Sequence, residues 1–179
     1  MIDEKIKKIL LDSCEEIQKE KVVWCKQHNA PLPEPIEVLN LIMKKDNALR
    51  ILKGDKNVEY RAYTSHYAER LFDKSVGDFA EKHINDEWAT EQMGMYGFLD
   101  ELRPVKKIHF HNYSNSWFLD VEVLNNGYVI ANKDGVETMN AFGDHELDAL
   151  VADLEKKKEN NRPVYFNFIL GSVIETNLK

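Results

Sequence analysis

Two histidines one residue apart, His109 and His111, are the residues in this chain whose types and spacing best suit chemistry. Alternate side chains of a β-strand point to the same face, so both imidazoles would lie on one side, about 7 Å apart. Such a pair is typical of metal sites. If the strand turns back at Ser114-Asn115, Asp120 on the next strand lies beside His109. Asp120 would then be either a third ligand or a group that orients the ligand. His145 is a further candidate. One hypothesis is therefore a small metal-dependent hydrolase that uses His109, His111 and Asp120.

The same residues also have a purely structural interpretation. The pairing places Lys107 opposite Glu122 and His109 opposite Asp120, and opposite charges on neighbouring strands stabilise many solvated sheet faces. Lys107 and Lys133 would also lie beside the histidines and repel a cation. We therefore prefer a solvated or protein-binding face to a metal site.

Other catalytic and cofactor motifs are missing from the sequence. It contains neither GxxxxGK[ST] nor GxGxxG, and no serine lies in a nucleophile-elbow motif. The two cysteines, Cys14 and Cys25, lack CxxC spacing and fall in one expected helix, where a free thiol is usually a small buried hydrophobe. We expect reduced thiols, a cytoplasmic protein, no cofactor and no enzymatic activity.

The acidic residues are concentrated in the middle of the chain. The net charge is −7, and residues 58–104 carry 10 acidic and 5 basic side chains. An acidic surface disfavours direct nucleic-acid binding, which depends on Lys and Arg, but it suits a protein partner with a basic surface. The acidic side chains that we expect to meet this partner are Glu59, Glu69, Asp73, Asp78, Glu81, Glu87, Glu91, Asp100 and Glu101.

Residues 105–141 have the pattern of an antiparallel β-meander. Apolar and polar residues alternate through Trp117–Leu124, which is typical of a half-buried strand. A first turn at Ser114-Asn115 would pair Ile108 with Val121 and Phe110 with Leu119. Asn126-Gly127 and Asp134-Gly135 are strong signals for two further hairpin turns.

These three turns place the apolar side chains of the meander on one face, and a slip of one residue would scatter them. The expected apolar face consists of Ile108, Phe110, Trp117, Leu119, Val121, Val123, Tyr128, Ile130 and Met139.

The N-terminal half has the periodicity of helices. Apolar residues recur at helical spacing in residues 2–27, 36–53, 58–70 and 72–84, and a capping signal at Asn85-Asp86 predicts another helix over 87–102. Three prolines within residues 31–35 separate the first two of these helices.

After the meander, a helix is expected to begin at Gly143-Asp144, with acidic residues in its first turn and lysines in its last. The apolar run Val164–Leu170 then predicts a central strand that ends at Gly171. The fold class is α+β, with a helical region over 1–104, an antiparallel sheet plus helix over 105–179 (β-β-β-β-α-β), and one compact unit in total.

The start of the chain is charged and helix-periodic, so we expect no signal peptide, and no run approaches the ~20 apolar residues of a membrane helix. The favoured hypothesis is a non-enzymatic, acidic protein-binding module. By analogy it would be an inhibitor, such as a toxin-immunity protein or a mobile-element-encoded inhibitor of a host nuclease. A third hypothesis is an assembly subunit that forms a homodimer through residues 2–27.

Overall fold

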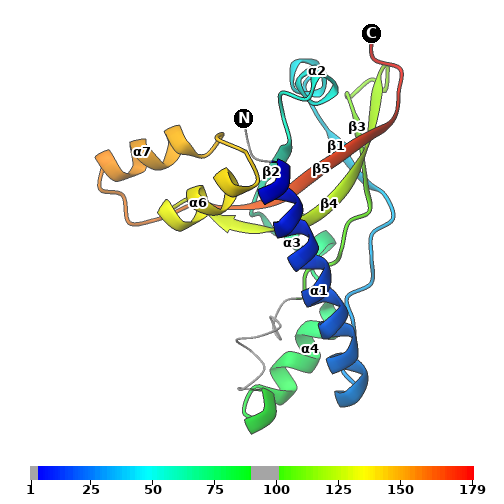
Figure 1. Ribbon diagram of the computed structural model, residues 1–179, viewed down its shortest axis with the longest axis vertical. Coiled ribbons are helices and arrows are strands. Elements are labelled where there is room, and N and C mark those ends of the chain that lie inside the picture. The colour runs from blue at the N-terminus through cyan, green and yellow to red at the C-terminus, as the bar shows by residue number, and fades with distance from the viewer. Residues whose placement is uncertain (1–3, 90–100) are drawn as a thin grey trace.

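The computed structural model describes residues 4–89 and 101–179 and has the expected α+β architecture (Figure 1). In chain order its elements are α1 (Glu4–His28), β1 (Leu39–Ile42), α2 (Lys45–Lys53), β2 (Val58–Ala62), α3 (Ser65–Leu71), α4 (Lys74–His83), β3 (Lys107–His111), β4 (Phe118–Ile130), α6 (Lys133–Ala141), α7 (Asp148–Lys156) and β5 (Val164–Thr176).

All five strands form one curled sheet in the order β1-β3-β4-β5-β2. β1 pairs with β3 in parallel, and the other pairs are antiparallel. β1 and β2 come from the region that the sequence predicts as helical, so the sheet takes strands from both sides of residue 104. β5 is a central strand, as its apolar run predicted, but it continues past Gly171 to Thr176.

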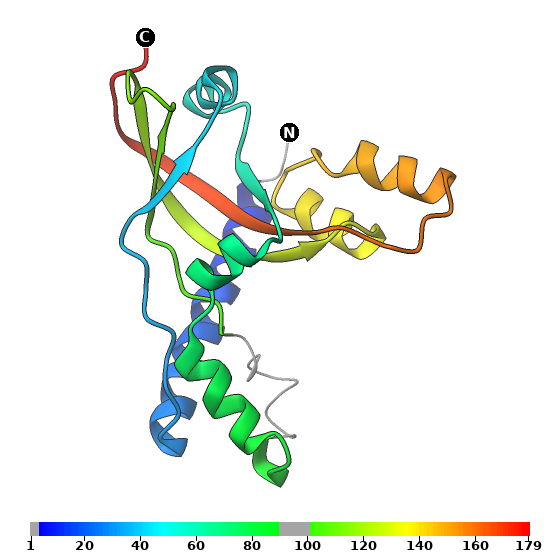
Figure 2. The same ribbon diagram turned by 180° about the vertical axis from the view of Figure 1, so that it is seen from behind.

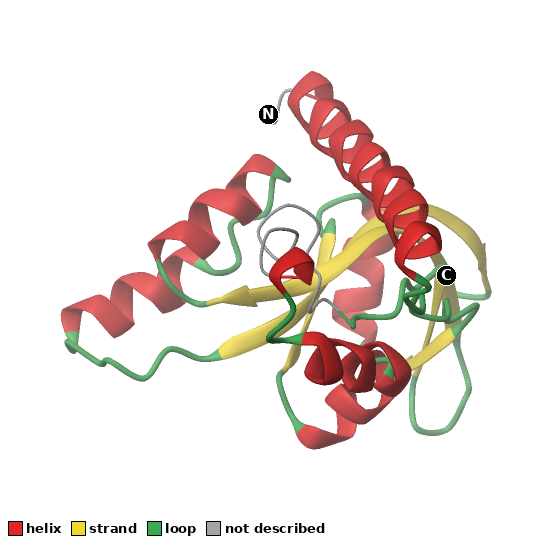
Figure 3. Ribbon diagram, turned by 90° about the horizontal axis from the view of Figure 1, so that it is seen from below, coloured by secondary structure: helices red, strands yellow, loops and turns green. Residues whose placement is uncertain are grey.

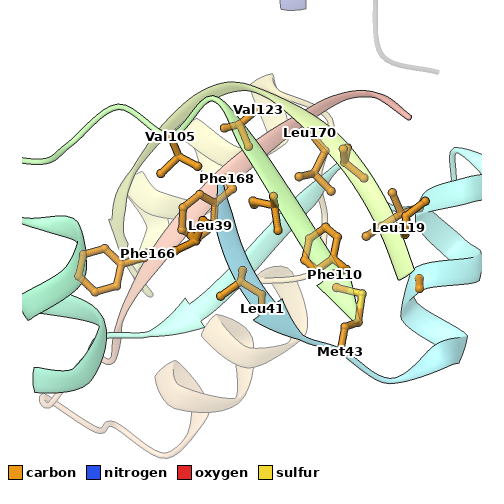
Figure 4. Close-up of a cluster of buried hydrophobic side chains, with 14 of the residues drawn as sticks. Leu39, Leu41, Met43, Val105, Phe110, Leu119, Val123, Phe166, Phe168 and Leu170 are labelled. Carbon is orange, nitrogen blue, oxygen red and sulfur yellow. The ribbon is translucent and has the colours of Figure 1, made fainter. Parts of the chain in front are cut away.

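The main core lies between one face of the sheet and the helices α2 and α3. Phe110, Leu119 and Val121 of the sheet have no exposed surface, and they pack in one cluster with Ala48 and Ile51 of α2 and with Leu71 of α3. Figure 4 shows this layer from within, with phenylalanine and leucine side chains of β1, β3, β4 and β5 converging.

A second core covers part of the opposite face. Val58, Val129 and Ile169 of the sheet pack against α6 and the first half of α1, including Leu10 and Leu11. The second half of α1 continues beyond the sheet and packs on α4 through Trp24, Cys25 and Ala80. The second half of α1 and α4 together form an arm that projects from the sheet, as both opposite views show (Figures 1 and 2).

The first hairpin of the predicted meander is confirmed. Lys107 lies opposite Glu122, Ile108 opposite Val121, His109 opposite Asp120 and Phe110 opposite Leu119. Asn115 adopts a left-handed φ of 51°, as a residue of the predicted turn can.

The hairpin predicted at Asn126-Gly127 is wrong, because β4 runs straight through both residues and pairs with β5. The Asn126 side chain instead bonds to the backbone of the segment before β3. Its Oδ1 accepts a hydrogen bond from Val105 N (2.8 Å), and its Nδ2 donates to Arg103 O (3.1 Å). Asn126 thus ties the chain before β3 to β4.

The hairpin predicted at Asp134-Gly135 is also wrong, because α6 begins there. Asn132 is the N-cap of this helix, and its side chain accepts a hydrogen bond from Gly135 N over 2.8 Å. Met139 is buried, as predicted, but from α6 rather than from a strand.

Tyr128 and Ile130 are not buried with the other residues of the predicted apolar face. The register of β4 on β5 shifts three times between Asp120 and Asn125, with two of the extra residues on β5 and one on β4, between Val123 and Asn125. The extra residue of β4 exchanges the two faces of the strand beyond it, so Tyr128 lies opposite Phe166 of the main core. Val129 is buried in the second core, whereas Tyr128 and Ile130 are 55% and 44% exposed.

Two predicted helices contain strands. Leu39 and Leu41 of β1 alternate with exposed residues and pack in the main core. The helix predicted over 36–53 therefore begins only at Lys45. Val58–Ala62 is β2, and the helix after it begins at Ser65. The helix predicted from Gly143-Asp144 begins later, at Asp148, and most of the helix predicted over 87–102 lies outside the described residues.

Candidate functional site

Asp120 is the centre of a polar group on the sheet face that the main core does not use. The residue as a whole is 7% exposed, and its carboxylate accepts two hydrogen bonds. One oxygen accepts a hydrogen bond from Lys107 Nζ over 2.7 Å, and the other accepts one from His109 Nδ1. Burial alone would raise the pKa of Asp120, but the hydrogen bonds and charges of Lys107 and His109 bring it below its usual value.

His111 lies beside His109 on β3, and the two ring centroids are 5.5 Å apart. Its Nδ1 lies 3.0 Å from the backbone oxygen of Asn112. The His109 ring also stacks on Phe118 of β4, with an interplanar angle of 19°. Both histidines are half-buried, so both rings are held in place and still reach solvent.

Asp120 does not serve as a third metal ligand in this arrangement, because both of its oxygens are already bonded to Lys107 and His109. It orients His109 instead. His145 lies before α7, where it pairs with Asp148. Within residues 4–89 and 101–179, no three His, Cys, Asp or Glu side chains are grouped closely enough to hold a metal. The hydrolase hypothesis therefore lacks a third ligand in the described chain.

The structure divides the nine acidic residues expected to bind a partner into three groups. Four are exposed, namely Glu69 on α3, Asp78 and Glu81 on α4, and Glu87 just after α4. In the part of the chain that the structure describes, none of these four carboxylates forms an ion pair or a hydrogen bond. We call them the acidic set.

Three others are engaged inside the protein, and two lie outside the described residues. Glu59 is 6% exposed and lies close to Lys56 and Arg61. Asp73 caps α4 by accepting from Ser75 N and also accepts from Glu34 N. Glu101 is half-buried against Gly77. The two outside the described chain are Glu91 and Asp100.

Glu59 belongs to a buried charge network that the sequence did not reveal. Burial raises the pKa of Glu59, although Arg61 and Lys56 lower it in part. Lys56 also bonds to Glu146 over 2.7 Å, and Tyr60 donates a hydrogen bond of 2.6 Å to Asp144. Burial, followed by this bond, raises the pKa of Tyr60. The network ties β2 to the segment between α6 and α7, and no local pattern links residues so distant in sequence.

A small cleft in the arm lies between α1 and α4. Its lining consists of Lys21, Trp24, Cys25, Ala30, Pro31, Val76 and Phe79, without a histidine or carboxylate. Burial raises the pKa of both thiols, Cys14 and Cys25, which disfavours the reactive thiolate. The lining therefore offers packing surface rather than an acid–base pair or an activated nucleophile.

No helix in the described ranges is both long and apolar enough to cross a membrane. Comparisons of the chain with protein-family models, with curated proteins and with solved structures found no match.

Proposed function

We propose that this protein is a non-enzymatic protein-binding module, of the inhibitor type, that meets a basic partner surface through the acidic set. The observation that carries this proposal is that Glu69, Asp78, Glu81 and Glu87 are exposed and without an internal ionic partner in the described chain. Exposed charges of one sign steer a complementary protein into contact and raise the association rate.

The position of the acidic set supports the proposal. Asp78 and Glu81 lie on α4, in the arm that projects from the sheet (Figure 2), where a partner could approach without meeting the sheet. Lys74 and Lys82 lie one turn from Asp78 on each side. These two lysines reduce the negative potential around Asp78, so replacing them should strengthen binding. They therefore supply an internal control.

The distribution of histidine–carboxylate pairs favours binding over catalysis. Among the described residues, the pairs His83–Asp86, His109–Asp120 and His145–Asp148 lie on three different parts of the surface. None of them lines the cleft in the arm. A catalytic base needs a concave site that holds the substrate against it.

The test uses the partner captured on the immobilised protein. We expect the combined variant Glu69→Gln, Asp78→Asn, Glu81→Gln, Glu87→Gln to associate about ten-fold or more slowly at low salt and to show a weaker salt dependence. Lys74→Gln with Lys82→Gln should accelerate association. Wild-type rates in the four-site variant would contradict the proposal.

A second candidate function, an assembly subunit, is favoured by the outer side of α1. Ile6, Ile9, Ile17 and Val23 are each about half exposed on this helix, which lies along the outside of the molecule (Figure 3). Single exposed apolar residues are common on protein surfaces, but a contiguous apolar patch is typical of an interface. This function predicts a dimer by light scattering that Ile9→Glu with Ile17→Glu dissociates, and a monomer at high concentration would exclude it.

A further inference from the structure

The neighbouring rings of His109 and His111 are each held by a hydrogen bond at the same ring nitrogen, Nδ1. His109 Nδ1 bonds to a carboxylate oxygen of Asp120, and His111 Nδ1 bonds to the backbone oxygen of Asn112. Ionised carboxylates and carbonyl oxygens only accept hydrogen bonds. Each neutral ring must therefore carry its proton on Nδ1, which leaves the lone pair of each Nε2 available.

We propose that His109 and His111 bind one divalent transition-metal ion of the zinc class through their Nε2 atoms. Metal-binding histidines almost always donate their other ring N–H to a carboxylate or a backbone carbonyl, and these two histidines have one partner of each kind. The proposal does not depend on the acidic set, which lies on α3, on α4 and just after α4.

The spacing of the rings agrees with a shared ion. With metal–nitrogen bonds of about 2.0–2.1 Å and a tetrahedral angle, two ligating imidazoles have centroids about 5 Å apart. The centroids of His109 and His111 are 5.5 Å apart, and the planes are inclined by 32°. The separation of the rings therefore agrees with one ion shared by the two imidazoles.

The charges around the rings permit a cation. Lys107 would repel a metal, but its ammonium group is bonded to Asp120 over 2.7 Å. Lys133, which the sequence placed beside the histidines, belongs to α6, where its ammonium lies 3.8 Å from Glu155. Asp120 accepts the Nδ1 hydrogen of His109, and a carboxylate partner of this kind increases the basicity of a ligating imidazole.

Two protein ligands leave the coordination shell of zinc incomplete, since zinc prefers four. No third ligand joins them among the described residues. The His109 side chain is 31% exposed, so water can fill the remaining positions in the isolated protein. The geometry fits a surface site that holds the ion, rather than an enclosed structural zinc centre.

Isothermal titration of the untagged, full-length protein with zinc chloride tests this site. We expect one zinc per chain, with affinity reduced at least ten-fold by His109→Ala and by His111→Ala. Asp120→Asn should weaken binding by about 10–100-fold through the orientation and basicity of His109. The exposed histidines give a matched control, so His66→Ala with His145→Ala should leave the affinity unchanged.

Imidazole ¹⁵N NMR of the wild-type protein locates the ion independently of any substitution. Zinc should shift the Nε2 resonances of His109 and His111 and leave those of His66 and His145 in place. Absence of zinc binding by the wild type would overturn the proposal. Unchanged binding in a folded His109→Ala, His111→Ala protein would overturn it as well.

Discussion

Arg61 on β2 donates a hydrogen bond from Nη2 to the backbone carbonyl of Ile42 on β1, over 3.0 Å, although these strands are the two opposite edges of the sheet. The same nitrogen lies 2.8 Å from Glu59 Oε1. From α3, Arg70 donates to Asn40 O of β1 over 3.4 Å. The curled sheet is thus closed by arginine side chains, which bind strand-edge carbonyls that would otherwise remain unpaired.

Replacing Arg61 with methionine should destabilise the protein strongly. The substitution keeps much of the aliphatic volume, but it leaves the buried Glu59 carboxylate with Lys56 alone and removes the bond to Ile42. Breaking a buried ion pair costs about 3–5 kcal/mol. Urea denaturation measures the free energy of unfolding, and Lys133→Met is the control, because the exposed Lys133–Glu155 pair should contribute less than about 1 kcal/mol. Equal effects of the two substitutions would contradict this account.

Gly127→Ala should leave stability unchanged or raise it by up to about 1 kcal/mol, because glycine weakens a strand interior. A Cβ at this position meets nothing nearer than the Asn167 side chain at 3.8 Å. A type I′ turn at Asn126-Gly127 would require positive φ there, and alanine would then be destabilising. Thermal unfolding of the variant therefore separates a continuous β4 from the hairpin that the dipeptide suggests.

Gly135→Ala should destabilise the protein, although alanine is the better helix former. An added Cβ would lie 2.0 Å from the Ile130 backbone oxygen and 2.9 Å from Val129 Cγ2, so α6 must move away from β4. Overpacking of this kind costs about 1–3 kcal/mol. Asn132→Ala should independently cost about 1 kcal/mol through the lost N-cap. A stabilised Gly135→Ala protein would show that α6 does not pack on β4 in this way.

Acid should remove the contribution of Asp120 to stability. Its folded-state pKa is below the usual value, so that contribution is complete above the unfolded pKa of about 4 and is lost as pH falls through the folded pKa. The stability difference between wild type and Asp120→Asn should be largest near neutral pH and should shrink below about pH 4. Denaturation curves recorded with EDTA across this range measure it, and a constant difference would refute the assignment.

The parts of the fold that the sequence predicted are those set by local pattern. Alternation through Trp117–Leu124, together with one turn, was sufficient to pair His109 with Asp120, and the long periodic stretch of α1 needed no tertiary information. The failures came from side chains whose partners are remote or whose role is ambiguous. Asn126 bonds to Arg103 and Val105, and Asn132 caps a helix; both resemble turn residues in sequence.

The short strands β1 and β2 lie in windows with helical spacing, and only pairing with β3 and β5 makes them strands. The bulges between β4 and β5 leave no local signal, and they move Val129 from the face of Val121 and Val123 to the face of the second core. The candidate site was also predicted in part, because the sequence placed His109, His111 and Asp120 next to one another. Only the structure shows that both oxygens of Asp120 are occupied, one by Lys107 and one by His109. Burial likewise separates Glu59 from the exposed acids of α3 and α4.

Capture from a lysate of the source cells tests the central proposal most directly, with three immobilised proteins compared by mass spectrometry at low and high salt. They are the wild type, the variant with the acidic set neutralised, and a control that neutralises four exposed acids elsewhere, Glu37, Glu137, Glu159 and Glu175. We predict a basic protein on the wild type and on the control, absent from the acidic-set variant and removed by high salt. The same proteins on all three surfaces, or none on any of them, would contradict a binding role for the acidic set.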